Sequence, residues 1–253
     1  MLWTSLGVVG GAALLSVVAA FVVDRLVSRE SRARYHDVSG HFFAAVGAFY
    51  AILVAFVVVA VWEDMEAAKK NTYVEANALP GLYFAATAFG EADKKAFQDI
   101  SVAYARAVIT EEWPLLAQGR TGPAVEDSAK RLRRAIVSVE VETPRQEALY
   151  SAMIERVNTV GTARRERLNE AHPSVPRFFW VGLIVGGCLV IGFALFFGPP
   201  GFGPHALMVM VLACLVSASL YFTYLMDHPF RGEVAVTPEA FRIALVQMGQ
   251  TPP

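Results

Sequence analysis

The chain has 253 residues, a formal net charge of −1 and a hydrophobic fraction of 55%, and it contains five histidines and two cysteines. Soluble domains are usually about 45–50% apolar, so this composition favours a membrane protein. The near-zero charge provides no dominant basic stripe, which argues against nucleic acid as the main partner.

Charge is distributed unevenly along the sequence. Residues 63–177 hold 16 of the 22 Lys and Arg and 17 of the 23 Asp and Glu, whereas residues 1–23, 42–62, 178–204 and 206–226 hold none. A helix rises about 1.5 Å per residue, so about 20 residues cross a hydrocarbon core of roughly 30 Å. The sequence therefore predicts an all-α integral membrane protein with four transmembrane helices, at about 2–23, 42–62, 178–197 and 206–226.

The first run is expected to stay as a span and not to be removed as a secretion signal. It has no basic residues at its start, and its apolar stretch is longer than the h-region of a signal peptide. Both cysteines, Cys188 and Cys214, fall inside predicted spans, where a thiol is usually a small packing residue.

The second span has no helix breaker after it. Glu63–Asn77 is rich in Glu, Ala and Lys, which favour helix, so we expect one long helix that leaves the membrane and ends near Pro80-Gly81. Apolar residues at helical spacing predict further helices over 91–117 and 123–141. A third is expected from Thr143, as N-cap before Pro144, to about Glu170.

These elements predict four segments. They are a first transmembrane hairpin (1–62), a helical extramembrane region between spans two and three (63–177), a second transmembrane hairpin (178–226) and a tail (227–253). The tail is expected to hold a short amphipathic helix, with Thr237 as its N-cap, that lies on the membrane surface or docks on the polar centre.

The flanking charges predict the orientation. Four arginines (Arg25, Arg29, Arg32 and Arg34) follow the first span, whereas eight Lys and Arg flank the spans on the side of the central region. The positive-inside rule then predicts a multi-pass protein of the inner (plasma) membrane with a cytoplasmic central region and cytoplasmic termini.

Two faces of the second span differ in side-chain size. Small residues share one face at helical spacing: Ala44, Gly47, Ala48, Ala51 and Ala55. Such a face allows close helix packing. On another face Phe42, Phe49, Phe56 and Glu63 recur every seven residues, flanked by Ile52 and Val59. A bulky apolar face of this kind can line a dewetting constriction in a channel, although the simpler alternative is that it meets lipid or core.

Charged residues come directly after this span on the same predicted helix. Glu63, Glu66 and Lys70, with Glu75 further on, would form charged rings at a pore mouth if several copies surrounded one axis. The alternative is a solvated helix with i,i+4 pairs such as Glu66–Lys70.

The sequence lacks the usual signatures of catalysis. There is no HExxH, P-loop, GxSxG or GxGxxG motif, and no two histidines have the spacing of a metal pair. The predicted spans hold no Asp, Glu, Lys, Arg or His, which also argues against a proton-coupled transporter. We therefore predict no catalytic residue, no metal and no cofactor, and a passive pore needs none of these.

The central region contains two motifs with a structural interpretation. Glu111 and Glu112 precede Trp113 and are candidates for a buried acid beside an aromatic anchor, and Arg164–Arg167 is rich in arginine. A Glu–Arg pair between helices is expected to be structural and not catalytic. Contact of the arginines with anionic lipid headgroups is the alternative.

Four segments together resemble the bacterial bestrophin-like family. They are Phe49–Phe56 (FYAILVAF) with Val61–Met65 (VWEDM), Glu111–Pro114 (EEWP), Arg164–Leu168 (RRERL) and Asp227–Gly232 (DHPFRG). The resemblance extends to bestrophins, which are pentameric anion channels with cytoplasmic termini and a hydrophobic neck on the second span. It implies a neck at Phe49, Ile52, Phe56 and Val59. Calcium-gated bestrophins carry an acidic run after the Pro-Phe, where this chain has Arg231-Gly232-Glu233, so calcium gating is not implied.

The second span and the resemblance lead to one hypothesis. The chain is expected to form a homo-oligomeric channel, with a pentamer favoured, that conducts monovalent ions through a pore lined by the second span. The acidic residues after the span leave the sign of the ion open. The alternative is a non-conducting membrane scaffold or sensor whose central helices bind a partner protein.

Overall fold

The computed structural model describes residues 2–26, 36–196, 201–232 and 234–253, and every regular element within them is helical. Four described helices are long and apolar enough to cross a membrane: α1 (Leu2–Leu26), α3 (His36–Ala85), α8 (Arg177–Phe196) and α9 (Phe202–Met226). The predicted fold class is confirmed, and the protein is a multi-pass membrane protein. Of the four first-loop arginines, Arg29, Arg32 and Arg34 lie outside the described residues.

Packing divides the chain into two units. The first, the spanning unit, contains residues up to Glu63 together with Ser174–Asp227, and the second, the helical unit, contains Asp64–Pro173 and His228–Pro253. These units are defined by packing and not by chain order, so the division into four segments stays a prediction.

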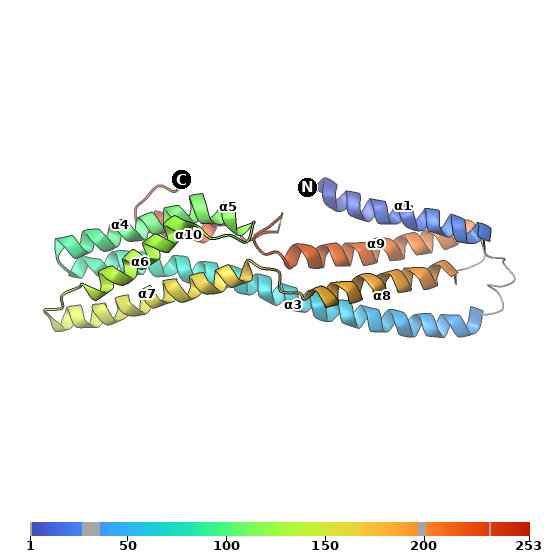
Figure 1. Cartoon of the computed structure of the whole chain (residues 1–253), viewed down its shortest axis with the longest axis horizontal. Helices are drawn as coiled ribbons and strands as arrows, with labels where there is room; N and C mark the ends of the chain where they lie inside the picture. Colours follow the sequence, from blue (N-terminus) through green and yellow to red (C-terminus); the bar gives the residue numbers. More distant parts are fainter. Residues whose placement is uncertain (1, 27–35, 197–200, 233) are drawn as a thin grey trace. The chain divides into compact units, whose positions relative to one another are not determined.

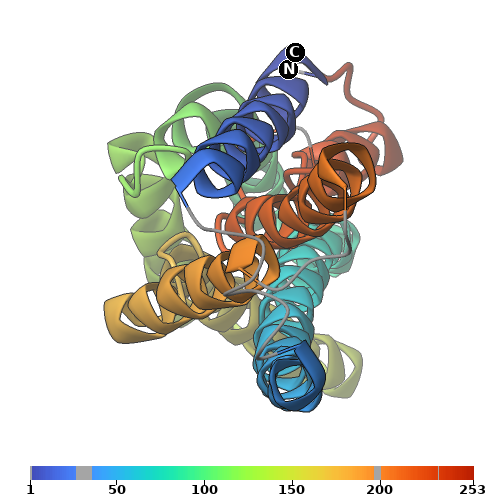
Figure 2. The same cartoon turned by 90° about the vertical axis from the view of Figure 1, so that its right-hand side faces the viewer.

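In the spanning unit, α1 lies beside α9 and α9 lies beside α8 (Figures 1 and 2). The contact of α8 with α3 depends on two glycines. A Cβ at Gly186 would stand 2.7 Å from the Tyr50 ring, and a Cβ at Gly187 would stand 2.9 Å from the Tyr50 hydroxyl and 2.9 Å from Val216. The missing side chains therefore let the aromatic ring lie directly against the backbone of α8.

Helix α3 is longer than predicted. It was expected to end at Pro80-Gly81, but it continues through Pro80 to Ala85, and that prediction is wrong. Proline removes one hydrogen bond from a helix interior. Here Leu79 and Leu82 on either side of the proline are fully buried, and we attribute the continued helix to this packing.

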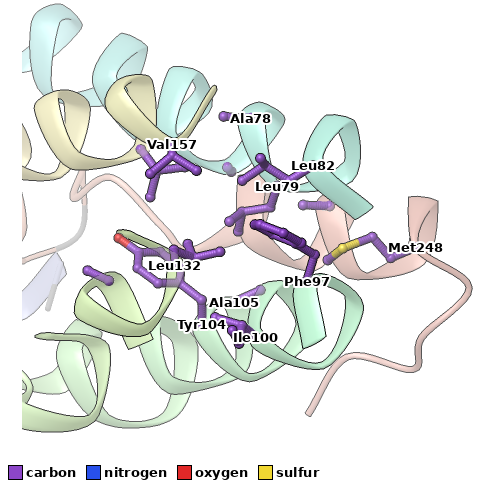
Figure 3. Packing of buried hydrophobic residues seen from close by; sticks show 14 of the residues in the cluster. Ala78, Leu79, Leu82, Phe97, Ile100, Tyr104, Ala105, Leu132, Val157 and Met248 are labelled. Carbon is purple, nitrogen blue, oxygen red and sulfur yellow. The ribbon is translucent and has the colours of Figure 1, made fainter. Parts of the chain in front are cut away.

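The helical unit has its own hydrophobic core. Its other elements are the 3-10 helix η1 (Ala86–Ala88), α4 (Glu91–Ala107), the π-helical turn η2 (Val108–Glu112), α5 (Trp113–Leu116), α6 (Pro123–Val137), α7 (Pro144–Glu170) and α10 (Glu239–Gln247). Figure 3 shows Leu79 of α3, Phe97 and Tyr104 of α4, Leu132 of α6 and Val157 of α7 in one cluster. Helices far apart in sequence thus share one core.

Local signals in this unit explain where its helices begin and end. Thr143 caps α7: its side chain accepts a hydrogen bond from the backbone N–H of Gln146, and the Gln146 side chain accepts one from the backbone N–H of Thr143. This capping box confirms the predicted N-cap. The helix expected over 123–141 ends at Val137. The tail helix α10 begins at Glu239, one residue later than Thr237 predicted, and Phe241 and Leu245 are buried in the core of this unit.

Candidate functional site

The bulky face of α3 is an unpacked apolar surface of the spanning unit. Phe49 is 77% exposed, Phe56 is 73% exposed, and Ile52 and Val59 are 55% and 54% exposed. All four lie on one side of the helix because their spacing alternates between three and four residues. Within the protomer no described side chain covers this face, so a membrane, another copy or a water-filled axis must do so.

A different face of α3 packs against the protomer's own helices. Tyr50, Val57 and Val61 are buried, and Tyr50 clusters with Val190 of α8 and Val216 of α9. The packing orients the helix, because it turns the phenylalanines at positions 49 and 56 away from α8 and α9. Sequence spacing predicted the two faces but did not show which of them this protomer covers.

The small-residue face of α3 lines an open apolar groove. Ala44, Gly47, Ala51 and Ala55 form one side of it, and Leu212 and Leu215 of α9 form part of the other. Its volume is about 510 Å³. The hydroxyl of Tyr50, which also lines this groove, is buried and has no hydrogen-bond partner among the described residues. The face expected to pack closely against a neighbouring helix is therefore left open by this chain.

The charged residues at the predicted pore mouth differ in their exposure to solvent. Glu63, Glu66 and Lys70 are exposed on α3, and within the described part of the helix Glu66 and Lys70 form no ion pair with each other. Glu75, by contrast, is fully buried, so the idea that it joins a ring of exposed charges is wrong. The first three residues remain available at the surface of the protomer.

Glu75 belongs to a buried ion-pair network in the helical unit. Arg167 Nε donates to Glu75 Oε2 at 2.7 Å, and Arg167 Nη2 donates to Glu75 Oε1 at 2.9 Å and to Glu112 Oε2 at 3.2 Å. Arg164 Nη2 donates to Glu112 Oε1 at 2.8 Å. The Tyr104 hydroxyl donates to Glu75 Oε1 at 2.6 Å. These contacts join α3, α4, η2 and α7.

Burial and charge act in opposite directions in this network. Burial raises the pKa of the Tyr104 phenol well above its usual value, and the carboxylate of Glu75 adds to the increase. Burial disfavours the charged form of Arg167, but the carboxylates of Glu75 and Glu112 outweigh it and raise the pKa of this guanidinium. Arg167 therefore stays charged and Tyr104 stays neutral. Such a network suits a structural role, in which it holds helices together, better than proton transfer.

Aromatic rings complete the surroundings of Arg167. Its guanidinium carbon lies 5.4 Å from the centre of the Trp113 ring and 5.7 Å from that of Phe241 in α10. The π-helical turn η2 ends at Glu112, immediately before Trp113. Sequence reasoning anticipated a structural Glu–Arg pair here. It did not separate exposed Glu111 from buried Glu112, and it missed Glu75 and Tyr104.

In the spanning unit, Asp227 holds the entry to α8 against the end of α9. It is 2% exposed, and its Oδ1 accepts from the backbone N–H groups of Ser174 at 2.9 Å and Val175 at 3.0 Å. Its Oδ2 accepts from Trp180 Nε1 at 3.3 Å. The aspartate of the DHPFRG segment therefore has a structural position that sequence reasoning did not assign.

Phe230 and Arg231 of the same DHPFRG segment make contacts within the helical unit. Arg231 Nε donates to the Ala117 carbonyl, and Phe230 packs edge-on against Trp113. Among the described residues no group of three His, Cys, Asp or Glu side chains has the arrangement of a metal site.

Comparisons with known proteins give one family match and several matches of fold. A family model of the bestrophin-like domain matches residues 10–241. The fold is similar to crystal structures of a bacterial bestrophin homologue from Klebsiella pneumoniae. One point variant has a TM-score of 0.71 and 15% identity over 96% of this chain and 99% of that one. A second variant has a TM-score of 0.68 and 14% identity over 97% and 98%.

A third structure of the Klebsiella pneumoniae homologue has a TM-score of 0.64 and 14% identity, and it covers 95% of this chain and 98% of that one. Identities this low establish a shared fold and nothing more. No curated protein matches the sequence. Because the family model extends from the first span to the tail helix, the chain belongs to the bestrophin-like family.

Proposed function

We propose that this protein is a homo-oligomeric, passive ion channel of the inner membrane, favoured as a pentamer, whose pore is lined by Phe49, Ile52, Phe56 and Val59 of α3. The observation that carries the proposal is the bulky face of α3, which stays uncovered although the same helix buries Tyr50, Val57 and Val61. A ring of such side chains from several copies forms a narrow apolar constriction that gates by dewetting. Membership of the bestrophin-like family supports the same assignment.

The open groove beside α3 supports association between copies. Its alanines and glycine let another helix approach closely, and its volume of about 510 Å³ is left unfilled within one protomer. A second copy is the occupant that a symmetric assembly supplies. The test is native mass measurement in detergent, in which a pentamer supports the proposal and a monomer favours the alternative of a non-conducting scaffold or sensor.

Conduction is tested with purified protein in liposomes. The wild type should pass chloride or a small monovalent cation, and Phe56→Ala should increase the flux because it widens and wets the constriction. Leu15→Ala is the control, since Leu15 is 71% exposed on α1, a helix that contributes no residue to the proposed pore or to the groove beside α3. Absence of flux for every ion tried under several gating conditions would remove the channel assignment.

The charges after the span are proposed to set ion preference at a cytoplasmic mouth. Neutralising Glu63 and Glu66 to glutamine should shift the reversal potential towards greater anion permeability, and Lys70→Gln should shift it the opposite way. Unchanged reversal potentials in all three variants would place these residues outside the ion path. A membrane-impermeant label on an added cysteine in the helical unit would test the proposed cytoplasmic location.

A further inference from the structure

At the junction of α6 and α7 in the helical unit, two carboxylates are each shared by two cations. Glu126 on α6 accepts from Arg164 Nη1 at 2.8 Å and also pairs with Lys130 Nζ at 3.3 Å. Glu112 already accepts from Arg164 and Arg167. Hydrogen bonds from Arg164 and Lys130 lower the pKa of the Glu126 carboxyl, as expected for an acid among excess positive charge.

Two further arginines meet at this junction over a glycine. Arg133 Nη2, from α6, and Arg165 Nη1, from α7, lie 3.3 Å and 3.7 Å from the position that a Cβ on Gly161 would take. Gly161 is buried, so the side chain of Arg133 lies across the surface of α7 where that helix has no side chain of its own. The two guanidinium groups, one from each helix, therefore both lie close to Gly161.

Neither of these guanidinium groups has a carboxylate partner among the described residues. The ion pairs that the structure shows on α6 and α7 involve Lys130, Arg164 and Arg167, and none of them involves Arg133 or Arg165. Arg165 Nη2 donates to Thr162 Oγ1 at 3.0 Å, which holds its planar fork in place. Two like charges brought together without a counter-ion repel each other, and a bound anion removes that repulsion.

We propose that Arg133 and Arg165 form a binding site for a phosphate group on the α6–α7 surface above Gly161. Each guanidinium presents a planar fork of N–H donors that matches the oxygens of a phosphate in a bidentate way, and a doubly charged oxyanion compensates both cations at once. Chloride offers one charge and no second oxygen for the fork. The phosphate comes either from a soluble compound or from a lipid headgroup.

The test compares thermal unfolding of the purified full chain in potassium phosphate and in potassium chloride at equal pH and ionic strength. A ligand that binds the folded state stabilises it in proportion to the logarithm of 1 + [L]/Kd, so phosphate should raise the melting temperature saturably. Arg133→Gln/Arg165→Gln should abolish this increase. Arg131→Gln/Arg145→Gln, which removes one exposed arginine from each of the same helices, should retain it.

The source of the phosphate is separated in lipid nanodiscs. Phosphatidylcholine discs with and without phosphatidic acid are compared in chloride buffer, with the same two double variants. Stabilisation by phosphatidic acid alone supports the site with a lipid source, and stabilisation by free phosphate supports it with a soluble source. The proposal is overturned if neither phosphate stabilises the wild type beyond chloride, or if both double variants lose the effect equally.

A conservative variant guards against simple misfolding. Arg133→Lys/Arg165→Lys keeps both charges but removes the forks, so it should fold as the wild type does in chloride and bind phosphate more weakly. Wild-type affinity in this variant would show that only net charge attracts the anion and would overturn a built phosphate site. These readouts do not depend on ion flux, so the site stands or falls separately from the channel assignment.

Discussion

Replacing Arg167 with methionine would remove the central cation of the buried network while keeping most of the side-chain volume. Arg167 is fully buried and makes three hydrogen bonds to two carboxylates, at 2.7, 2.9 and 3.2 Å. In the variant Glu75 keeps only the hydroxyl of Tyr104, and Glu112 keeps Arg164. The buried negative charge of Glu75 is then left without a compensating cation.

The expected cost arises from that uncompensated charge. Breaking a buried ion pair by removing one partner costs about 3–5 kcal/mol. For a chain of this size 1 kcal/mol corresponds to about 2–4 °C, so the melting temperature in detergent should fall by roughly 6–20 °C. Adding Glu75→Gln to Arg167→Met should recover much of the loss, because the neutral amide still accepts from Tyr104 and leaves no buried charge.

Arg145→Met is the matched control, since Arg145 is exposed at the start of the same helix. Its effect should lie within about 0.5 kcal/mol of zero. A loss of less than about 1 kcal/mol in Arg167→Met, or a failure of Glu75→Gln to restore stability, would refute the argument that the network holds the helical unit together.

Three other outcomes are expected from single contacts. Burial, together with the charges of Glu166 and Asp64, raises the pKa of Glu170, so ionisation of this carboxyl destabilises the fold as the pH rises above about 4.5. Glu170→Gln should therefore raise the melting temperature at pH 7.5 and have no such effect at pH 4. Gly187→Val should lower the melting temperature and weaken the assembly in native mass measurement, because its side chain collides with Tyr50. Asp227→Ala leaves two backbone N–H groups without their acceptor and should cost about 1–3 kcal/mol in thermal unfolding.

Sequence reasoning was most successful where one physical requirement dominates. Crossing a bilayer demands a long run without charge, so the four spans were predicted from charge alone, and α8 and α9 begin within a few residues of the expected positions. The N-cap at Thr143 was likewise predicted, because hydroxyl side chains satisfy free N–H groups at helix starts.

Tertiary packing decided the features that local sequence rules left open. Pro80 is a helix breaker by those rules, yet it lies inside α3. Glu75 looks like the exposed acids before it on the same helix, and only the arrival of Arg167 from α7 explains its burial. The exposed state of Phe49 and Phe56 depends on which face α8 and α9 cover, and periodicity within one helix carries no information about that choice.

The π-helical turn η2 has a consequence for related sequences. It accommodates one more residue per turn than an α-helix does, and it ends at Glu112, just before Trp113. Deleting a single residue from this turn would restore regular α-helical winding and leave α4 and α5 close to their present orientation, because the wider turn takes up the extra residue. Relatives that are one residue shorter in this turn can therefore keep an acid at the position of Glu112 against the guanidinium of Arg167, and a one-residue gap inside an otherwise helical alignment would mark the loss of the π-helical turn and not of the network.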